Sequence, residues 1–195
     1  MFERFENRHI RLLVTMLLFA SSAPVLAQIE RQHGAHVHGT STVDIALDGK
    51  TLTIHLDAPG MNLLGFEHAP RDAVERAKVS SVLADLNAPS VWLQPAAGAA
   101  CRLMHVDVES KGLGGVAAAT SNSPLNREPV SAETHADFDA DYTFECAQPD
   151  RLDNIDIQLI ARYAATTIVT VNIASRAGQS TVDLSGSNTR ASFPQ

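Results

Sequence analysis

Three of the chain's eight histidines lie within six positions, between residues 33 and 39. Neutral imidazole is the commonest protein ligand for transition metals. One residue separates His36 from His38, and on a β-strand this spacing places both side chains on one face, where they can bind an ion together. The chemistry that this stretch offers is therefore metal ligation. The alternative is a polar N-terminal tail whose histidines have no role. If the strand forms, we expect His33 to be the least ordered of the three.

Other histidines stand next to carboxylates: His55 near Asp57, Glu67 beside His68, and His135 near Asp137. Imidazole with carboxylate suits Zn²⁺, and also Cu²⁺ or Ni²⁺, whereas Ca²⁺ prefers oxygen ligands. Because a ligating histidine must be neutral, we expect metal affinity to fall below about pH 6.5, the unperturbed pKa of histidine. His55 taken singly is better explained as an exposed strand residue, and the acidic row that follows His135 as a solvated strand face.

No catalytic motif accompanies these residues. The chain lacks G-x-S-x-G, H-E-x-x-H, a P-loop and a dinucleotide-binding fingerprint. Its net charge of −7 disfavours a nucleic-acid partner, because phosphate binding needs a basic face. The sequence thus favours a non-catalytic binding protein. A protein-interaction or adaptor module with incidental histidines is the alternative, and a metal-dependent hydrolase with Glu67 as general base is a distant third.

The first 27 residues have the pattern of a secretory signal. Basic residues at positions 4, 8 and 11 precede an apolar run over 12–20, and Val25-Leu26-Ala27 offers small or apolar residues before a cut. The run is shorter than the ~20 residues of a membrane span. We therefore expect one exported domain over residues 28–195, located in the periplasm of a Gram-negative cell and without stable membrane insertion after signal cleavage.

The chain has two cysteines, Cys101 and Cys146. An even number in an exported protein favours one disulfide. Two buried thiols or two thiolate ligands for a metal are the alternatives, although the C-x-x-C spacing of a zinc site is missing.

Apolar and polar residues alternate on both sides of Asp48-Gly49, the kind of pair that most strongly predicts a tight β-hairpin. If Leu47 faces Lys50 across this turn, His38 continues the polar face of the first strand. Asp57 then lies on the diagonal from His38, within reach of a shared metal ion. Asp57 is accordingly a candidate ligand.

The rest of the pattern predicts mostly strands and one good helix. We expect the helix over 71–86, a mobile Gly/Ser/Pro-rich loop over 110–131, and an unusually apolar connection over 61–70 that lies across the core. Strands are predicted over 101–109, where imperfect alternation indicates a bulge, and over 134–146, 155–159, 168–173 and 180–184. The predicted fold is α+β: an antiparallel sheet packed against the main helix in two layers, with one disulfide.

Several of these strings resemble the ZrgA-like family of periplasmic zinc-binding proteins, long catalogued as a domain of unknown function. They are His36-Val37-His38-Gly39, Ala58-Pro59-Gly60-Met61-Asn62, Gly65-Phe66-Glu67-His68-Ala69-Pro70, Cys101, His135-x-x-Phe138 and Tyr142-x-Phe144-x-Cys146. The resemblance implies a non-enzymatic zinc binder that serves zinc uptake or buffering and works with a metal transporter or its binding protein. It implies His36, His38, His68 and His135 as ligands, with Glu67 as a further ligand or a hydrogen-bonding partner of one.

In one respect the chain departs from that family. Members often carry a His/Asp-rich tract between the first cysteine strand and the H-x-x-F strand, whereas residues 110–131 contain no histidine here. The sequence therefore argues against a second, loop-based zinc site and against a storage role.

Overall fold

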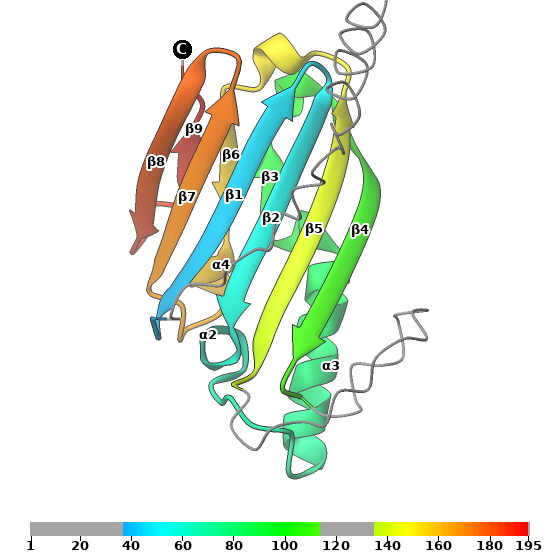
Figure 1. Cartoon of the computed structure of the whole chain (residues 1–195), viewed down its shortest axis with the longest axis vertical. Helices are drawn as coiled ribbons and strands as arrows, with labels where there is room; N and C mark the ends of the chain where they lie inside the picture. Colours follow the sequence, from blue (N-terminus) through cyan, green and yellow to red (C-terminus); the bar gives the residue numbers. More distant parts are fainter. Residues whose placement is uncertain (1–36, 114–134, 195) are drawn as a thin grey trace, which may run out of the picture. The chain divides into compact units, whose positions relative to one another are not determined.

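The computed structural model describes residues 37–113 and 135–194, which fold around two β-sheets (Figure 1). The larger has the strand order β4-β5-β2-β1-β7-β8 and the smaller β3-β6-β9. The strands are β1 (Thr40–Asp48), β2 (Thr51–Pro59), β3 (Leu93–Pro95), β4 (Cys101–Lys111), β5 (Asp137–Cys146), β6 (Asn154–Ile157), β7 (Ile168–Ser175), β8 (Gly178–Ser185) and β9 (Arg190–Ser192). The predicted signal segment, His36 and most of the predicted loop over 110–131 lie outside the described residues.

The helical elements of the described residues are few. They comprise α2 (Gly60–Leu64), α3 (Ala73–Asn87), α4 (Leu159–Arg162) and the short 3-10 turns η1 (Pro89–Val91), η2 (Ala97–Ala99) and η4 (Pro149–Arg151). The main helix, α3, packs on one face of the large sheet (Figure 1), which confirms the predicted α+β fold class. Within the described residues no helix is long and apolar enough to cross a membrane.

The large sheet is mixed rather than wholly antiparallel. Its strands pair antiparallel except for β1 and β7, which run parallel. Parallel neighbours need a long crossover connection, and most of the chain separates β1 from β7. Alternation within one strand carries no information about the direction of a partner so far away, so the sequence pattern could not reveal this pair.

The β1–β2 hairpin has a different register from the one predicted. Leu47 lies opposite Leu52, not opposite Lys50, because Gly49 and Lys50 rather than Asp48 and Gly49 form the two-residue turn. Gly49 alone of these residues has a positive φ, 58°. The shift is two residues, and since side chains alternate with period two, every side chain keeps its predicted face while its cross-strand partner changes.

The core is formed by the large sheet together with α3 and the small sheet. The predicted helix boundaries hold to within two residues: Asp72 caps the N-terminus by accepting a hydrogen bond from the Glu75 amide at 2.9 Å. Tyr142 of β5 donates its hydroxyl to the Leu86 carbonyl at 3.0 Å and packs edge-on against Trp92. Even-numbered side chains of β5 point into this core, as predicted; they are Phe138, Ala140, Tyr142, Phe144 and Cys146.

Other local predictions are confirmed. Cys101 and Cys146 form a disulfide, and β4 contains an irregularity between Leu103 and His105. The connection after β2 does cross the core: it contains the short helix α2, and Leu63 and Leu64 are buried. Strands β7 and β8 form the predicted closing hairpin around Arg176-Ala177.

Candidate metal site

The Glu67 carboxylate joins two histidines that are far apart in the sequence. Its Oε1 lies 2.9 Å from Nε2 of His38, and its Oε2 lies 2.7 Å from Nδ1 of His135. The Glu67 side chain is only 12% exposed, whereas those of His38 and His135 are 60% and 71% exposed. The arrangement is a shielded carboxylate between two imidazoles that solvent can reach.

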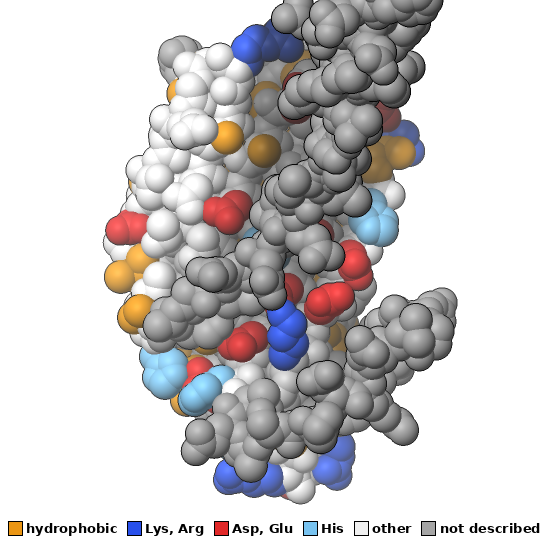
Figure 2. Space-filling model, viewed as in Figure 1, with side chains coloured by type: hydrophobic (Ala, Val, Ile, Leu, Met, Phe, Trp, Pro, Cys, Tyr) orange, Lys and Arg blue, Asp and Glu red, His pale blue; other side chains and the backbone are white. Residues whose placement is uncertain are grey.

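Sheet topology brings these three residues together. Strands β1 and β5 both run antiparallel to β2, so the residues before β1 and β5 lie at the same end of the sheet as the residues after β2. His38 precedes β1, His135 precedes β5, and Glu67 follows β2 and α2. A backbone hydrogen bond also joins Glu67 to the neighbour of His135, since the Ala136 amide donates to the Glu67 carbonyl at 3.2 Å. Figure 2 shows histidine side chains gathered at the end where β1 begins.

Glu67 is ionised at neutral pH. Burial opposes its ionisation and is the largest single influence, but the hydrogen bonds and charge interactions with His135 and His38 together outweigh it and lower the pKa of Glu67 below its ordinary value of 4.5. A carboxylate and two imidazoles are donors that zinc prefers. The donor set at this end of the sheet therefore fits a zinc ion in kind and charge.

His68 is adjacent to Glu67 in sequence, but its contacts lead elsewhere. Its ring stacks on Phe66, with centroids 4.9 Å apart, and its Nδ1 lies 3.0 Å from the Ala69 carbonyl and 3.9 Å from Glu75 Oε2. An Nδ1–H that donates to a carbonyl leaves Nε2 with its lone pair available. His68 is thus held at the start of α3 with one nitrogen available to an ion, outside the pairings of Glu67.

Asp57 does not lie diagonal to His38 as predicted. The two-residue change of hairpin register places it opposite Thr42 on β1, and its partner on β5 is Asp139. Since the expected diagonal relied on pairing Leu47 with Lys50, it fails together with that register. Asp57 belongs instead to the acidic outer face of the sheet, whose red side chains are visible in Figure 2.

That outer face contains a second histidine–carboxylate group. Nδ1 of His55 lies 3.0 Å from Asp141 Oδ1 and Nε2 lies 3.9 Å from Asp139 Oδ1. Lys111, which sequence reasoning missed, donates to Asp139 Oδ2 at 3.0 Å and offsets part of the negative charge. The basic residue at the end of β4 could have been linked to this face only by knowing that β4 pairs with β5.

Asn62 was also overlooked as a contributor to the site. It is buried, 1% exposed, in α2, the short helix that precedes the loop carrying Glu67. The available signal was a single amide among the apolar residues Met61, Leu63 and Leu64. Buried polar side chains are normally hydrogen-bonded, and such a residue in an apolar segment predicts specific partners.

Within the ranges 37–113 and 135–194, no set of three or more His, Cys, Asp or Glu side chains could hold a metal ion as it stands. The geometry explains this result. The two histidines contact different oxygens of Glu67, and the ring nitrogens that face the carboxylate are already engaged in these contacts. Of the sequence-predicted ligands, the structure thus brings together His38, Glu67 and His135 and leaves His68 and Asp57 apart. His36 is outside the described residues.

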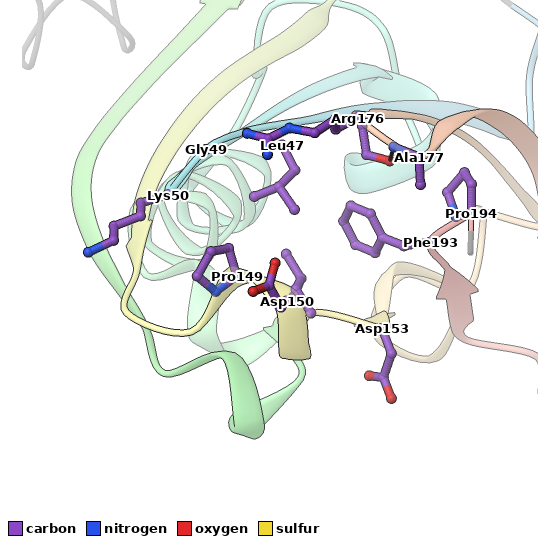
Figure 3. A pocket seen from close by; sticks show the side chains of 12 residues that line it. Leu47, Gly49, Lys50, Pro149, Asp150, Asp153, Arg176, Ala177, Phe193 and Pro194 are labelled. Carbon is purple, nitrogen blue, oxygen red and sulfur yellow. Dashed lines mark hydrogen bonds between the residues drawn. The ribbon is translucent and has the colours of Figure 1, made fainter.

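A hollow of about 440 Å³ lies at the other end of the sheet, beside the β1–β2 and β7–β8 turns (Figure 3). Leu47 and Phe193 point into it, and the exposed residues Lys50, Arg176 and Asp150 stand around it. Its lining includes no histidine and none of the sequence-predicted ligands. The candidate site is therefore the Glu67 cluster at the opposite end.

Fold and site together define an α+β domain with a histidine–carboxylate cluster at one end of its main sheet. The family model described as "ZrgA family zinc uptake protein" matches residues 35–193, and the chain belongs to this family. The resemblance seen in the sequence is thereby confirmed, and with it a relation to zinc. A comparison with curated proteins finds no match.

Proposed function

We propose that the protein is a periplasmic, non-catalytic zinc-binding accessory protein that takes up Zn²⁺ as cargo and supports its import. His38, Glu67 and His135 are the proposed core of the binding site, and His36 and His68 are the further ligands. The observation that carries the proposal is the convergence of His38 and His135 on the single carboxylate of Glu67.

The exposure of the site supports reversible binding. Structural zinc sites are closed and usually have four protein ligands, whereas His38 and His135 are more than half exposed. An ion can enter from solvent, and a partner can remove it. This suits cargo that is handed to a metal transporter or to the transporter's binding protein, and the net charge of −7 favours the approach of a cation.

Binding requires the side chains to exchange partners. In the metal-free cluster each histidine shares a hydrogen bond with Glu67, so an ion must either replace these protons between nitrogen and oxygen or bind the other ring nitrogens. In the second case Glu67 orients the imidazoles, as carboxylates beside metal-bound histidines commonly do. Both arrangements use the same three residues and need His36 or His68 to complete the coordination.

The test is zinc calorimetry on the purified protein. The variant His38→Ala/His135→Ala should bind Zn²⁺ at least about 100-fold more weakly. Removing a residue that only orients a ligand already lowers metal affinity by about 10–100-fold, and this variant removes two ligands. His55→Ala/His105→Ala, which removes two histidines from the sheet itself, is the matched control and should retain the wild-type affinity. The variant His36→Ala/His38→Ala should also bind sharply less well. Unchanged affinity in the His38/His135 variant would exclude this site.

The second candidate function is a protein-interaction or adaptor module. It is favoured by the lack of a ready-made three-ligand group in the described chain and by Leu103 and Met104, which are exposed on edge strand β4. On this alternative, Glu67 and its histidines only fasten the ends of β1 and β5. The wild-type protein would then show no zinc affinity beyond the micromolar background of any histidine-bearing surface, and the same calorimetry distinguishes the two.

A further inference from the structure

The side-chain amide of Asn62 makes three hydrogen bonds, all to the segment that directly follows His38. Its Oδ1 accepts from the Gly39 amide at 2.7 Å, and its Nδ2 donates to the Thr40 carbonyl at 2.8 Å and to Ser41 Oγ at 3.0 Å. Asn62 and Ser41 are each 1% exposed. Because these groups are buried, breaking the hydrogen bonds is costly: the released donors and acceptors could not form replacement hydrogen bonds with water.

Gly39 is held from its other side by the segment before β7. Its carbonyl accepts from the amides of Thr167 at 2.8 Å and Ile168 at 2.9 Å. Its φ is 86°, and a Cβ would lie 2.7 Å from Thr167 Oγ1. The backbone next to His38 is therefore fixed between α2 and β7, although the His38 ring itself is mostly exposed.

The same short segment also fixes the backbone next to His135. The Gly60 amide donates to the Ala136 carbonyl, and a Cβ on Gly60 would lie 2.6 Å from that oxygen. The stretch from Gly60 to Asn62 thus contacts the chain beside both histidines that meet at Glu67. Its polar side chain, Asn62, acts on the His38 side.

We propose that Asn62 is a positioning residue that sets the zinc affinity of His38 without contacting the ion. This inference rests on the proposed zinc-binding function. An imidazole on a loosely held backbone must lose conformational freedom when it binds an ion, whereas the hydrogen bonds of Asn62 remove the backbone part of that freedom when the protein folds. Residues that orient metal ligands typically contribute about 10–100-fold to affinity.

A double-mutant cycle tests the proposal on the purified protein, with Zn²⁺ alone as the probe. Asn62→Ala should weaken zinc binding by about 10-fold in the wild-type background and by less than about 2-fold in a His38→Ala background, because only coupled residues lose additivity. With Co²⁺ as a spectroscopic substitute, the visible absorption of Asn62→Ala should move toward that of His38→Ala. The proposal is overturned if Asn62→Ala lowers zinc affinity as much in the His38→Ala background as in the wild-type background, or if it does not lower zinc affinity in the wild-type background.

Thr166→Val is the matched control. Thr166 is also 1% exposed, and its hydroxyl donates to the backbone carbonyl of Asn62 at 3.3 Å. This variant removes a buried hydrogen bond from the same place but leaves the side-chain amide of Asn62 intact, so zinc affinity should change less than about 2-fold. An equal loss in both variants would show that general loosening, not positioning, is responsible, and would overturn the proposal.

Two outcomes keep this test separate from that of the proposed function. If His38→Ala alone leaves zinc affinity unchanged, the proposed site fails, whatever Asn62→Ala does. If Asn62→Ala does not fold, Ser41→Ala removes one of the three hydrogen bonds of Asn62 and replaces it in the cycle. It should then weaken zinc binding by about 2- to 5-fold, and only in the presence of His38.

Discussion

Oε2 of Glu67 lies 2.7 Å from Nδ1 of His135, although 68 positions separate the two residues in the sequence. The contact exists because β5 begins beside the loop that follows α2, where the Ala136 amide also donates to the Glu67 carbonyl. His38 reaches the other oxygen of the same carboxylate from the start of β1. One shielded carboxylate therefore links the beginnings of two strands, and most of the behaviour expected of the site follows from it.

Replacing Glu67 by Gln should weaken zinc binding by about 10- to 100-fold. The substitution keeps the shape of the side chain but removes the negative charge that attracts the ion and that both imidazoles share. Glu145→Gln is the matched control, because Glu145 is exposed and its ion pair is with a surface residue, Arg102, at 3.5 Å. Calorimetry should show wild-type affinity in the control, and equal affinities for all three proteins would remove Glu67 from the site.

Glu67 should also make metal-free stability depend on pH in a defined window. Because the pKa of Glu67 in the folded protein lies below its ordinary value of 4.5, the unfolded chain binds more protons near that pH than the folded protein does. The stabilisation from the ionised carboxylate is therefore present above about pH 4.5 and is lost as the pH falls through the lower folded-state pKa. This contribution is measured by urea unfolding of wild-type protein and of Glu67→Gln, both in EDTA, between pH 3 and pH 6.

The difference between those two curves is the informative quantity. Hydrogen bonds from Arg162 and Thr189 lower the pKa values of Asp85 and Asp156 respectively, so every variant loses stability in acid. Subtracting the Glu67→Gln curve isolates Glu67. The difference in unfolding free energy between wild-type protein and Glu67→Gln should be constant above pH 5 and shrink toward pH 3. A difference that grows in acid would contradict the lowered pKa of Glu67.

Sequence periodicity predicted much of the fold because most of its elements are local. The alternation of β5 and the 3.6-residue spacing of Val79, Val82 and Leu86 each report one buried face. The β1–β7 pair and the exact hairpin register depend on contacts between segments, and a shift of two residues preserves every face. Alternation therefore could not detect the wrong register.

The site was predictable in its residue types but not in its pairings. His38, Glu67 and His135 were named from the sequence, since histidine and carboxylate are metal-ligand chemistry. That Glu67 joins both histidines, while Asp57 faces Asp139, depends on the order and direction of strands β1, β2 and β5. A single amide in an apolar segment marks Asn62 in the sequence, but its partners, two backbone groups and the Ser41 hydroxyl, belong to a segment more than 20 positions away and could not be named from the sequence.

Gly60→Ala should disturb the His135 side of the site. A Cβ at Gly60 would lie 2.6 Å from the Ala136 carbonyl oxygen, so the start of β5 must shift. We expect a loss of about 1–3 kcal/mol in unfolding free energy and about 10-fold weaker zinc binding. Gly98→Ala is the control, since its Cβ would meet the Arg151 side chain at an ordinary 3.6 Å. Wild-type zinc affinity in Gly60→Ala would show that the position of His135 is unimportant.

The disulfide should contribute to stability without affecting the metal. Cys101 and Cys146 are cross-strand partners of β4 and β5 and close a loop with a sequence separation of 45. Loop entropy predicts that Cys101→Ser/Cys146→Ser loses ~4 kcal/mol of unfolding free energy, measurable by urea denaturation, with reduced wild-type protein as the control. His135 lies just before β5 and Cys146 is the last residue of β5, so the two are about 37 Å apart at ~3.4 Å per residue. Zinc affinity of the folded variant should therefore equal that of the wild type. A loss of affinity at a temperature where the variant is folded would show that the disulfide end of β5 affects the metal site.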